Sequence, residues 1–302
     1  MHEFLVASHG LSASYWLAYS LNLHPDIVCI HGSDRSVVSD QDELDIDRLL
    51  ERGGPGLLFR KLQDIRAGAE ARQGGFDRQQ YDRWMSEIYP GSGIVGSVHS
   101  FRMRDFEKIE TTALSGLTVC NLIRHPVSLV NSGCGLLSRS FLYDLNELRW
   151  TASKVYQDDI SFVESLSAEY NLKPGENETL SFFGACVMMK GLSLDAEVCE
   201  SMKARSSYLG EFRMEALTSD REAFARLIKG ISEDTLDSDG DYLDRVFESD
   251  RLNAHSNRRN VSKPGHVWDQ WAPWQRKAFQ HYFEKYGIRS FYGRLGYDFS
   301  FM

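Results

Sequence analysis

The alternation of short apolar runs with helical patterns is the feature that most restricts how this chain can fold. Residues 4–7 are apolar, residues 8–12 form a small polar turn, and apolar residues recur at helical spacing over 14–23. A second apolar run covers 27–30, and Leu117–Ile123 is the clearest buried strand. A strand, a helix and a second strand in this order predict a parallel sheet. We therefore expect an α/β fold in which helices flank a central parallel sheet.

The rest of the chain adds elements of both kinds. Residues 40–90 carry glycine pairs between charged helical patterns and predict a helical insertion over one face of the sheet. Because the chain has no internal repeat and no long linker, we expect a single domain over 1–302. The remaining expected elements are strands at 94–98 and 208–214, helices within 141–205 with a break at 173–175, and helices at 221–231 and 274–286.

Charge and cysteine content argue against several classes of function. The chain has 34 Lys and Arg against 43 Asp and Glu, a net charge of −9, which disfavours nucleic acid and anionic membranes as partners. No apolar stretch has membrane-spanning length. The five cysteines lack the close spacing of zinc or thiol–disulfide motifs, and Cys29 and Cys120 fall in apolar runs as buried thiols do. With no signal-peptide pattern, we expect a reducing, cytoplasmic location.

The turn after the first strand is a candidate anion site. It holds Ser12 and Ser14 and leads directly into a helix, whose first N–H groups and dipole favour a negative charge. It is not a Walker P-loop, because the GxxxxGK[ST] pattern and its lysine are absent. The alternative is an ordinary strand-to-helix turn with serine as the N-cap.

Two further segments carry cations at positions suited to a phosphate. Arg124 follows the strand Leu117–Ile123, Pro126 permits a helix start, and Ser132 lies eight residues after the arginine, roughly two helical turns. An arginine and a hydroxyl brought together bind phosphate well. The alternative is an arginine paired with a surface carboxylate.

The second cationic segment covers residues 257–268. It places Arg258, Arg259 and Lys263 within six residues, followed by Gly265 and, shortly after, Trp268, without an acidic residue in the loop. A basic loop in an acidic protein favours an anionic ligand. The alternative is a solvated loop, which is the usual role of a short charged run.

Taken in order, these segments resemble the sulfotransferases that use 3′-phosphoadenosine 5′-phosphosulfate (PAPS). The family's first signature is a strand followed by Tyr-Pro-Lys-Ser-Gly-Thr-Thr-Trp-Leu, and Ser12, Ser14, Trp16 and Leu17 fall on its serine, first threonine, tryptophan and leucine. The second is a strand followed by Arg-x-Pro with a serine eight residues after the arginine. The third is a late basic loop with glycine just before a tryptophan. The resemblance covers most of the chain and implies a P-loop-NTPase-like sulfotransferase architecture.

The resemblance also implies which residues hold the donor. The backbone of Ser12, Ala13, Ser14 and Tyr15, with Trp16 beside it, corresponds to the loop around the 5′-phosphosulfate. The 3′-phosphate is expected at a second group of residues, which are Arg124, Ser132, Arg258, Arg259, Lys263 and Gly265. Met214 falls on an aromatic position that packs against the adenine in cytosolic members.

The expected catalytic base is His99, because in the family a histidine follows the strand that precedes the Arg-x-Pro strand. A neutral imidazole suits proton removal from an acceptor hydroxyl. The alternative is a histidine that is simply hydrogen-bonded at a strand end. The sequence departs from the family at Leu11, where a lysine normally neutralises the leaving group, and at Ala13, where the family has glycine. The cations considered as substitutes are His9, Arg35, Arg102 and Arg104.

The resulting prediction is a sulfotransferase that moves a sulfuryl group from PAPS to a small alcohol, phenol or sugar without a metal. One alternative is a nucleotide-binding protein that catalyses poorly, motivated by Leu11. A small-molecule kinase is disfavoured, because the P-loop lysine and a clear Mg²⁺ carboxylate after a strand are absent. Asp237, Asp239, Asp241 and Glu248 have EF-hand spacing, but a tyrosine occupies the glycine position, so we interpret them as an acidic solvated loop.

Overall fold

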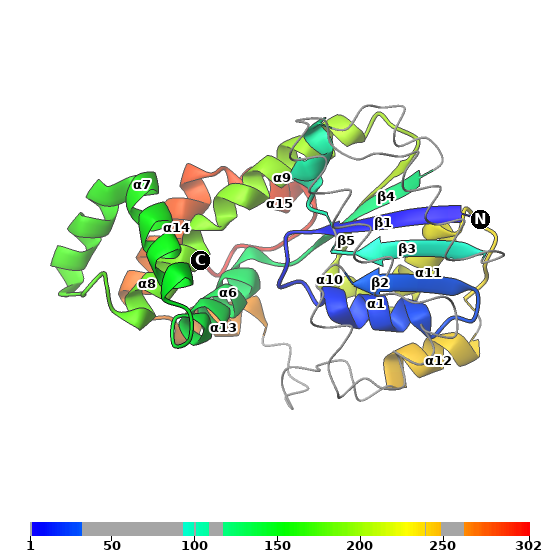
Figure 1. Cartoon of the computed structure of the whole chain (residues 1–302), viewed down its shortest axis with the longest axis horizontal. Coiled ribbons are helices and arrows are strands. Elements are labelled where there is room, and N and C mark those ends of the chain that lie inside the picture. Colours follow the sequence, from blue (N-terminus) through cyan, green and yellow to red (C-terminus); the bar gives the residue numbers. More distant parts are fainter. Residues whose placement is uncertain (1, 32–92, 100, 109–116, 239, 249–262) are drawn as a thin grey trace. The chain divides into compact units, whose positions relative to one another are not determined.

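The computed structural model describes residues 2–31, 93–99, 101–108, 117–238, 240–248 and 263–302. The chain divides into two compact units (Figure 1). The sheet unit comprises residues 1–123 and 197–259, and the helical unit comprises residues 124–196 and 260–302. The predicted insertion at 40–90, and Arg35, Arg258 and Arg259, lie outside the described residues. The expectation of a single domain stays a prediction.

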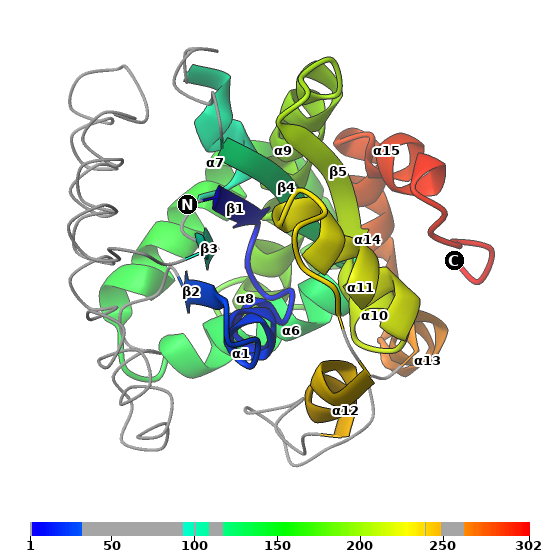
Figure 2. The same cartoon turned by 90° about the vertical axis from the view of Figure 1, so that its right-hand side faces the viewer.

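The described part of the sheet unit contains one sheet of five parallel strands in the order β2-β3-β1-β4-β5. Figure 2 shows the strands close to end-on, with β1 between β3 and β4. The predicted fold class is therefore confirmed, as are the predicted strands. Their bounds are β1 (His2–Ser8), β2 (Ile27–His31), β3 (Ile94–Val98), β4 (Leu117–Ile123) and β5 (Tyr208–Arg213).

Side chains explain why these runs form central strands. Every residue of β3 and β4 is buried, which is typical of parallel strands covered on both faces. On one face, Phe4 and Val6 of β1 belong to an apolar cluster that also contains Trp16 and Phe224. These two side chains come from α1 (Ser14–Asn22) and α11 (Arg221–Ile231). Two short elements of this unit are η1 (Met103–Lys108) and α10 (Met214–Leu217).

The interpretation of residues 237–248 as an acidic loop is wrong for most of the segment. Helix α12 spans Gly240–Glu248, and Tyr242 and Val246 are buried in the same apolar cluster as α1. The Tyr242 hydroxyl donates to the Ser20 carbonyl at 3.1 Å. The acidic residues lie between buried ones at helical spacing, so they mark an amphipathic helix rather than a calcium loop.

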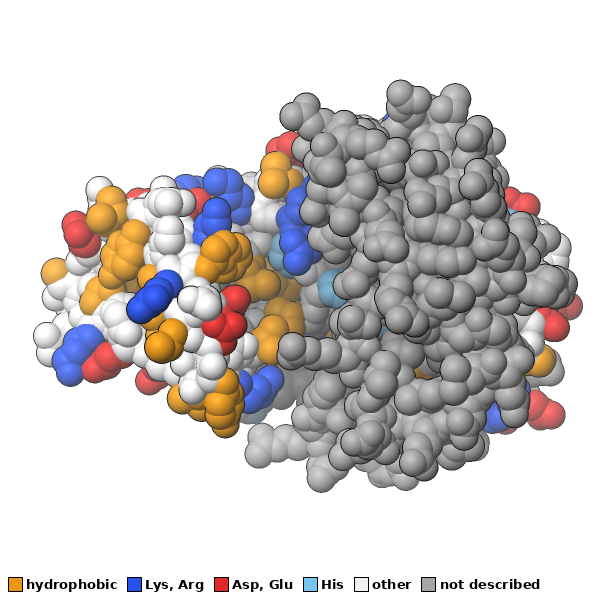
Figure 3. Space-filling model, viewed as in Figure 1, with side chains coloured by type: hydrophobic (Ala, Val, Ile, Leu, Met, Phe, Trp, Pro, Cys, Tyr) orange, Lys and Arg blue, Asp and Glu red, His pale blue; other side chains and the backbone are white. Residues whose placement is uncertain are grey.

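The described part of the helical unit is built from helices around an aromatic core. Phe182 packs edge-on against Trp271 and Trp274, and Phe279 contacts Trp268. Figure 3 shows hydrophobic, basic and acidic side chains interspersed on the viewed face of this unit. Its helices are α6 (Pro126–Ser140), α7 (Leu145–Tyr170), α8 (Asn177–Val187), α13 (Pro264–Gln270), α14 (Pro273–Lys285) and α15 (Ile288–Arg294), and α9 (Met189–Met202) runs from this unit into the sheet unit. The predicted break at 173–175 is confirmed between α7 and α8.

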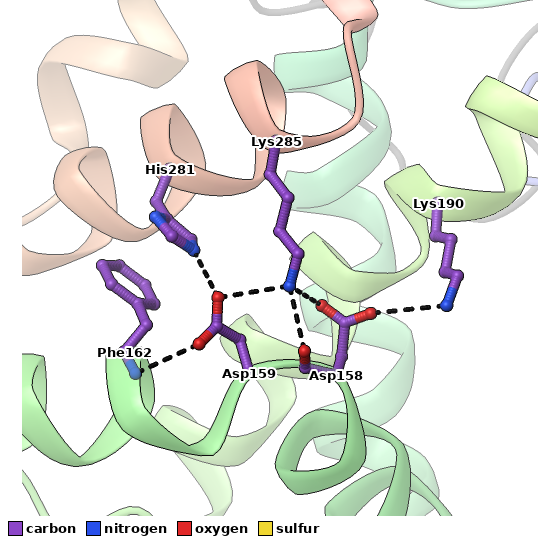
Figure 4. A network of polar contacts seen from close by, with 6 residues as sticks. All are labelled: Asp158, Asp159, Phe162, Lys190, His281 and Lys285. Carbon is purple, nitrogen blue, oxygen red and sulfur yellow. Dashed lines mark hydrogen bonds and ion pairs between the residues drawn. The ribbon is translucent and has the colours of Figure 1, made fainter.

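A second break, which the sequence did not predict, lies inside α7. Asp159 has non-helical backbone angles (φ −159°, ψ 71°), and its carboxylate accepts a hydrogen bond from the Phe162 N–H at 3.2 Å, as an N-cap does. Figure 4 shows that Lys285 of α14 lies between this carboxylate and that of Asp158. The break is therefore held by a helix that is distant in sequence.

Two further observations bear on the predictions from composition. None of the helices among the described residues is both long and apolar enough to span a bilayer. Cys29 and Cys120 are buried, as predicted. Burial raises the pKa of both thiols, which favours the neutral and unreactive form.

Candidate functional site

The strand order points to one end of the sheet as the place for a ligand. The chain fills positions on one side of β1 with β2 and β3, then crosses to the other side for β4 and β5. Ligands of open α/β sheets bind at the carboxyl ends of the strands beside such a reversal. Ser8, His31 and His99 lie at or directly after the carboxyl ends of β1, β2 and β3.

The turn after β1 is tightly wound and is stabilised by its own hydrogen bonds. The Gly10 N–H donates to Ser8 Oγ at 3.1 Å, and the Ser12 hydroxyl donates to the Gly10 carbonyl at 3.0 Å. Gly10, Leu11 and Ala13 all have positive φ values of 97°, 57° and 52°. Glycine adopts this region freely, whereas an L side chain there costs about 1–2 kcal/mol. The turn therefore has a specific shape that two of its residues do not favour.

Helix α1 begins without a side-chain cap from its N-cap residue. The N-cap is Ala13, which has no side-chain oxygen, so the alternative of a serine N-cap is excluded. Ser14 is instead the first helical residue. The first-turn N–H groups of a helix need acceptors, and the helix dipole favours anions at that point. This local structure fits an anion-binding turn.

His99 lies against this turn. Its backbone N–H donates to the Val6 carbonyl at 2.9 Å, and its Nδ1 lies 3.0 Å from the Ser8 carbonyl oxygen. A carbonyl oxygen only accepts, so Nδ1 carries the proton and Nε2 is the basic nitrogen of the neutral ring. A Cβ built on Gly10 would lie 3.2 Å from His99 Cε1 and 3.5 Å from Nε2, so glycine gives this ring its space. The structure thus brings His99 and the turn together.

His31 is a neighbour of the turn that the sequence analysis missed. Its Nε2 lies 2.9 Å from Ser14 Oγ, and both side chains are buried. Its ring centroid is 5.4 Å from that of His99 and 5.7 Å from that of Tyr15. A histidine at the end of an apolar run was the available signal, but only the pairing of β2 with β3 places it beside His99.

The described cations considered in place of the missing lysine have different surroundings. Arg104 of η1 has Nη2 3.5 Å from His9 Nδ1, at the outer limit of a hydrogen bond, and His9 belongs to the turn. Arg102 is exposed, and its backbone N–H donates to Asp105. Of these candidates, Arg104 is the one with a contact to the turn.

The Arg124–Ser132 pair predicted from spacing is present in the helical unit. Arg124 Nη1 donates to Ser132 Oγ at 2.8 Å. The next residue, His125, is the N-cap of α6: its Nδ1 accepts from the Val127 N–H at 3.2 Å, and its Nε2 lies 3.2 Å from the Asp298 carbonyl oxygen and donates to it. Pro126 occupies the first helical turn, as expected.

The described part of the basic loop meets this helix start within the same unit. Phe301 of the C-terminal tail has its ring centroid 5.8 Å from that of His125 and 6.4 Å from that of Trp268. A Cβ on Gly265 would lie 3.6 Å from the Phe301 ring. Lys263, the N-cap of α13, is exposed just before Gly265. The second and third sequence motifs are therefore joined through one aromatic side chain.

Two of the predicted donor contacts are core residues. Met214 is 3% exposed and belongs to the same apolar cluster as Trp16, which packs edge-on against Phe224. Their roles toward adenine and the 5′ end stay predictions. Within the described ranges, no three His, Cys, Asp or Glu side chains are grouped as metal ligands.

Comparisons with known proteins add little to this picture. No protein-family model matches the chain, and no curated protein matches it. Among solved structures, the chain is similar to the sulfotransferase domain from the curacin biosynthetic pathway, with 14% identity, a TM-score of 0.41, and coverage of 95% of this chain and 97% of that one. At this level of similarity the match decides neither family nor activity, so the function must be argued from the residues of this chain.

Proposed function

We propose that the protein is a sulfotransferase that takes a sulfuryl group from PAPS and passes it to the hydroxyl of a small organic acceptor. The observation that carries the proposal is the position of His99. Its Nδ1 is bound to the Ser8 carbonyl, and its ring lies against the Gly10 turn, where the family resemblance assigns the reactive end of the donor.

The family resemblance assigns the two charged ends of the donor to two groups of residues. The N–H groups at the start of α1 and the hydroxyl of Ser14 bind the 5′-phosphosulfate. Arg124 and Ser132 bind the 3′-phosphate, because a guanidinium already hydrogen-bonded to a hydroxyl offers several directed donors to one phosphate. The resemblance assigns Lys263 and Gly265 to the same phosphate, together with Arg258 and Arg259.

The reaction is a single displacement at sulfur. The acceptor oxygen forms the new S–O bond while the bond from sulfur to the bridging phosphate oxygen breaks, and that oxygen leaves with the electron pair as part of adenosine 3′,5′-bisphosphate. His99 Nε2 takes the proton of the acceptor hydroxyl. The scheme calls for no metal, because amides and cations hold the donor. The acceptor is a small alcohol, phenol or sugar.

One observation favours a second candidate function, a nucleotide-binding protein with little catalysis. Leu11 stands where the family's lysine stabilises charge on the leaving oxygen, and losing one such donor can cost roughly 3 kcal/mol of transition-state stabilisation. The same leucine argues against a kinase, which needs a lysine at the phosphates.

The first experiment separates these classes by ligand. Thermal shift is measured with adenosine 3′,5′-bisphosphate and, separately, with ATP and Mg²⁺. Sulfotransferase and binding protein both predict stabilisation by the bisphosphate. Stabilisation by ATP with Mg²⁺ alone would refute the proposal.

The second experiment separates the enzyme from the binding protein. Labelled PAPS is incubated with panels of alcohols, phenols and sugars, and transfer of label is measured for the wild type, His99→Gln and His2→Gln. His2 lies at the amino end of β1, opposite the candidate site, and serves as the matched control. We expect His99→Gln to lose turnover at least about 100-fold while it keeps bisphosphate binding, and His2→Gln to keep both. Equal turnover in all three proteins would remove His99 from its role.

A further inference from the structure

The turn after β1 lacks the positive charge that the family's lysine supplies at the position of Leu11. The proposed donor brings negative charge to this turn, and Leu11 cannot balance it. Sulfuryl transfer adds charge to the leaving phosphate oxygen, and a preorganised positive group beside it lowers the barrier. A cation at this point must come from another element of the fold.

Resting on the proposed function, we propose that His31 is a positioning residue that becomes protonated when the donor binds and acts on it through the Ser14 hydroxyl. His31 Nε2 lies 2.9 Å from Ser14 Oγ, and the two side chains are each 7% exposed. Ser14 is the first residue of α1, so its hydroxyl is at the helix end that faces the predicted anion. The pair therefore connects a titratable ring to the candidate phosphosulfate site.

Whether Nε2 of His31 carries a hydrogen decides the direction of this hydrogen bond. With Nε2 unprotonated, the Ser14 hydroxyl donates to the ring and turns its lone pairs outward, which an anion disfavours. With Nε2 protonated, the ring donates to Ser14, and the hydroxyl hydrogen is released to bind the anion. A fully protonated imidazole adds a positive charge that a bound anion stabilises further. The neutral Nε2–H tautomer also donates to Ser14, so it is the charge of the imidazolium that couples donor binding to proton uptake by His31.

The described residues around His31 are consistent with different protonation states for His31 and His99. Among the described residues, the titratable groups in ring contact with His31 are His99 after β3, with ring centroids 5.4 Å apart, and Tyr15 of α1, at 5.7 Å. Two imidazolium rings so close repel each other, so a charged His31 disfavours a second proton on His99. His99, with its Nδ1–H fixed on Ser8, then remains neutral and able to act as the base. One histidine supplies charge and the other accepts the proton.

The test measures proton uptake when adenosine 3′,5′-bisphosphate binds. Calorimetric titrations are run near pH ~7.5, about one unit above the ordinary pKa of histidine, in buffers with different ionisation enthalpies. The proteins are the wild type, His31→Gln, Ser14→Ala and His2→Gln. Glutamine retains a hydrogen-bond donor near the Nε2 position but cannot take a charge, so it separates charge from packing. Because all proteins bind the same ligand, the titration of its own phosphates cancels in the comparison.

We expect the wild type and His2→Gln to take up nearly one proton more than His31→Gln. The affinity of the wild type should rise relative to that of His31→Gln as the pH falls from about 8.5 to 7, by up to about tenfold per unit, and Ser14→Ala should show reduced coupling. Equal proton uptake and equal pH dependence in the wild type and His31→Gln would overturn the inference while leaving the proposed function intact. If the folded wild type does not bind the bisphosphate at all, the proposed function fails, and the role of His31 fails with it.

Discussion

Removal of the Lys285 ammonium group is expected to destabilise the protein far more than removal of the nearby Lys277 group on the same helix. Lys285 Nζ lies 2.7 Å from Asp158 Oδ2, 3.2 Å from Asp159 Oδ2 and 3.0 Å from the Asp158 carbonyl oxygen. His281 Nε2 contacts the Asp159 carboxylate at 2.9 Å (Figure 4). Lys285→Ala therefore removes three contacts at the point where α7 breaks.

The magnitude follows from burial. The Asp158 side chain is 7% exposed and that of Lys285 is 30% exposed. Removing one partner of a fully buried pair costs about 3–5 kcal/mol. Here the lysine retains some solvent contact and Lys190 remains 3.6 Å from Asp158, so we expect about 2–3 kcal/mol for Lys285→Ala.

Lys277→Ala is the matched control. Lys277 contacts Glu169 at 2.6 Å and 2.8 Å, shorter distances than most of those made by Lys285. The two side chains are 49% and 47% exposed, and solvent screens an exposed pair so that it adds little to stability. A ranking by contact distance alone would therefore predict the larger loss of stability for the wrong lysine.

Urea unfolding followed by tryptophan fluorescence measures both variants. A loss for Lys285→Ala of less than about 1 kcal/mol, or one no larger than that for Lys277→Ala, would refute the argument from burial.

The same cluster predicts a pH dependence with a definite sign. Burial opposes ionisation of Asp158, but the hydrogen bond and charge of Lys285 and the charge of Lys190 outweigh it, so the pKa of this carboxyl lies below its ordinary value. Asp159 behaves likewise through His281 and Lys285. A carboxyl whose pKa is lowered by folding stabilises the folded protein at pH values above its ordinary pKa of about 3.9. This stabilisation is lost as the pH falls through the pKa that the carboxyl has in the folded protein. Stability should therefore fall more steeply below pH ~4 in the wild type than in Lys285→Ala.

Three smaller changes test the turn and the tail. Ala13→Gly should raise the unfolding free energy by up to about 1 kcal/mol, because relief of the positive φ outweighs the entropy of glycine, and a lower melting temperature would contradict this. Gly10→Ala should displace the His99 ring, because the new Cβ would lie 3.2 Å from it. We expect turnover to fall at least about tenfold, with bisphosphate affinity measured in parallel. Unchanged turnover would show that the position of the ring is not required. Phe301→Ala should cost about 1–2 kcal/mol in urea unfolding, since it removes a half-buried ring that contacts His125, and a change within error would mean that the tail does not hold this helix start.

Local patterns were sufficient for the elements of the sheet. The strands Ile94–Val98 and Leu117–Ile123 were predicted with their observed bounds, because a strand buried on both faces must be apolar throughout. Helix α12 was not predicted, because closely spaced acidic residues indicated a solvated loop and the buried stripe formed by Tyr242 and Val246 is short. The break in α7 was missed because it depends on Lys285, which lies 126 residues after Asp159 in the chain.

The candidate site likewise contains one residue pair that local spacing predicted and another that it did not. The spacing of Arg124 and Ser132 predicted a pair that is hydrogen-bonded in the structure, because Arg124 directly precedes the N-cap of α6 and Ser132 lies within the first two turns of that helix. His31 has no motif. Its contact with Ser14 forms when α1 packs against β2, and its place beside His99 arises only when β2 pairs with β3.

Sequence alone thus determined the strands, several of the helices and the turn after β1, since each of these depends on side chains within a few residues of one another. Tertiary structure decided which groups meet at the carboxyl ends of the strands. Strand order and the packing of α1 on β2 bring together His31, Ser14 and His99, which are separated by up to 85 positions along the chain. No local periodicity encodes that order, because it results from how whole strands pair and how helices cover them.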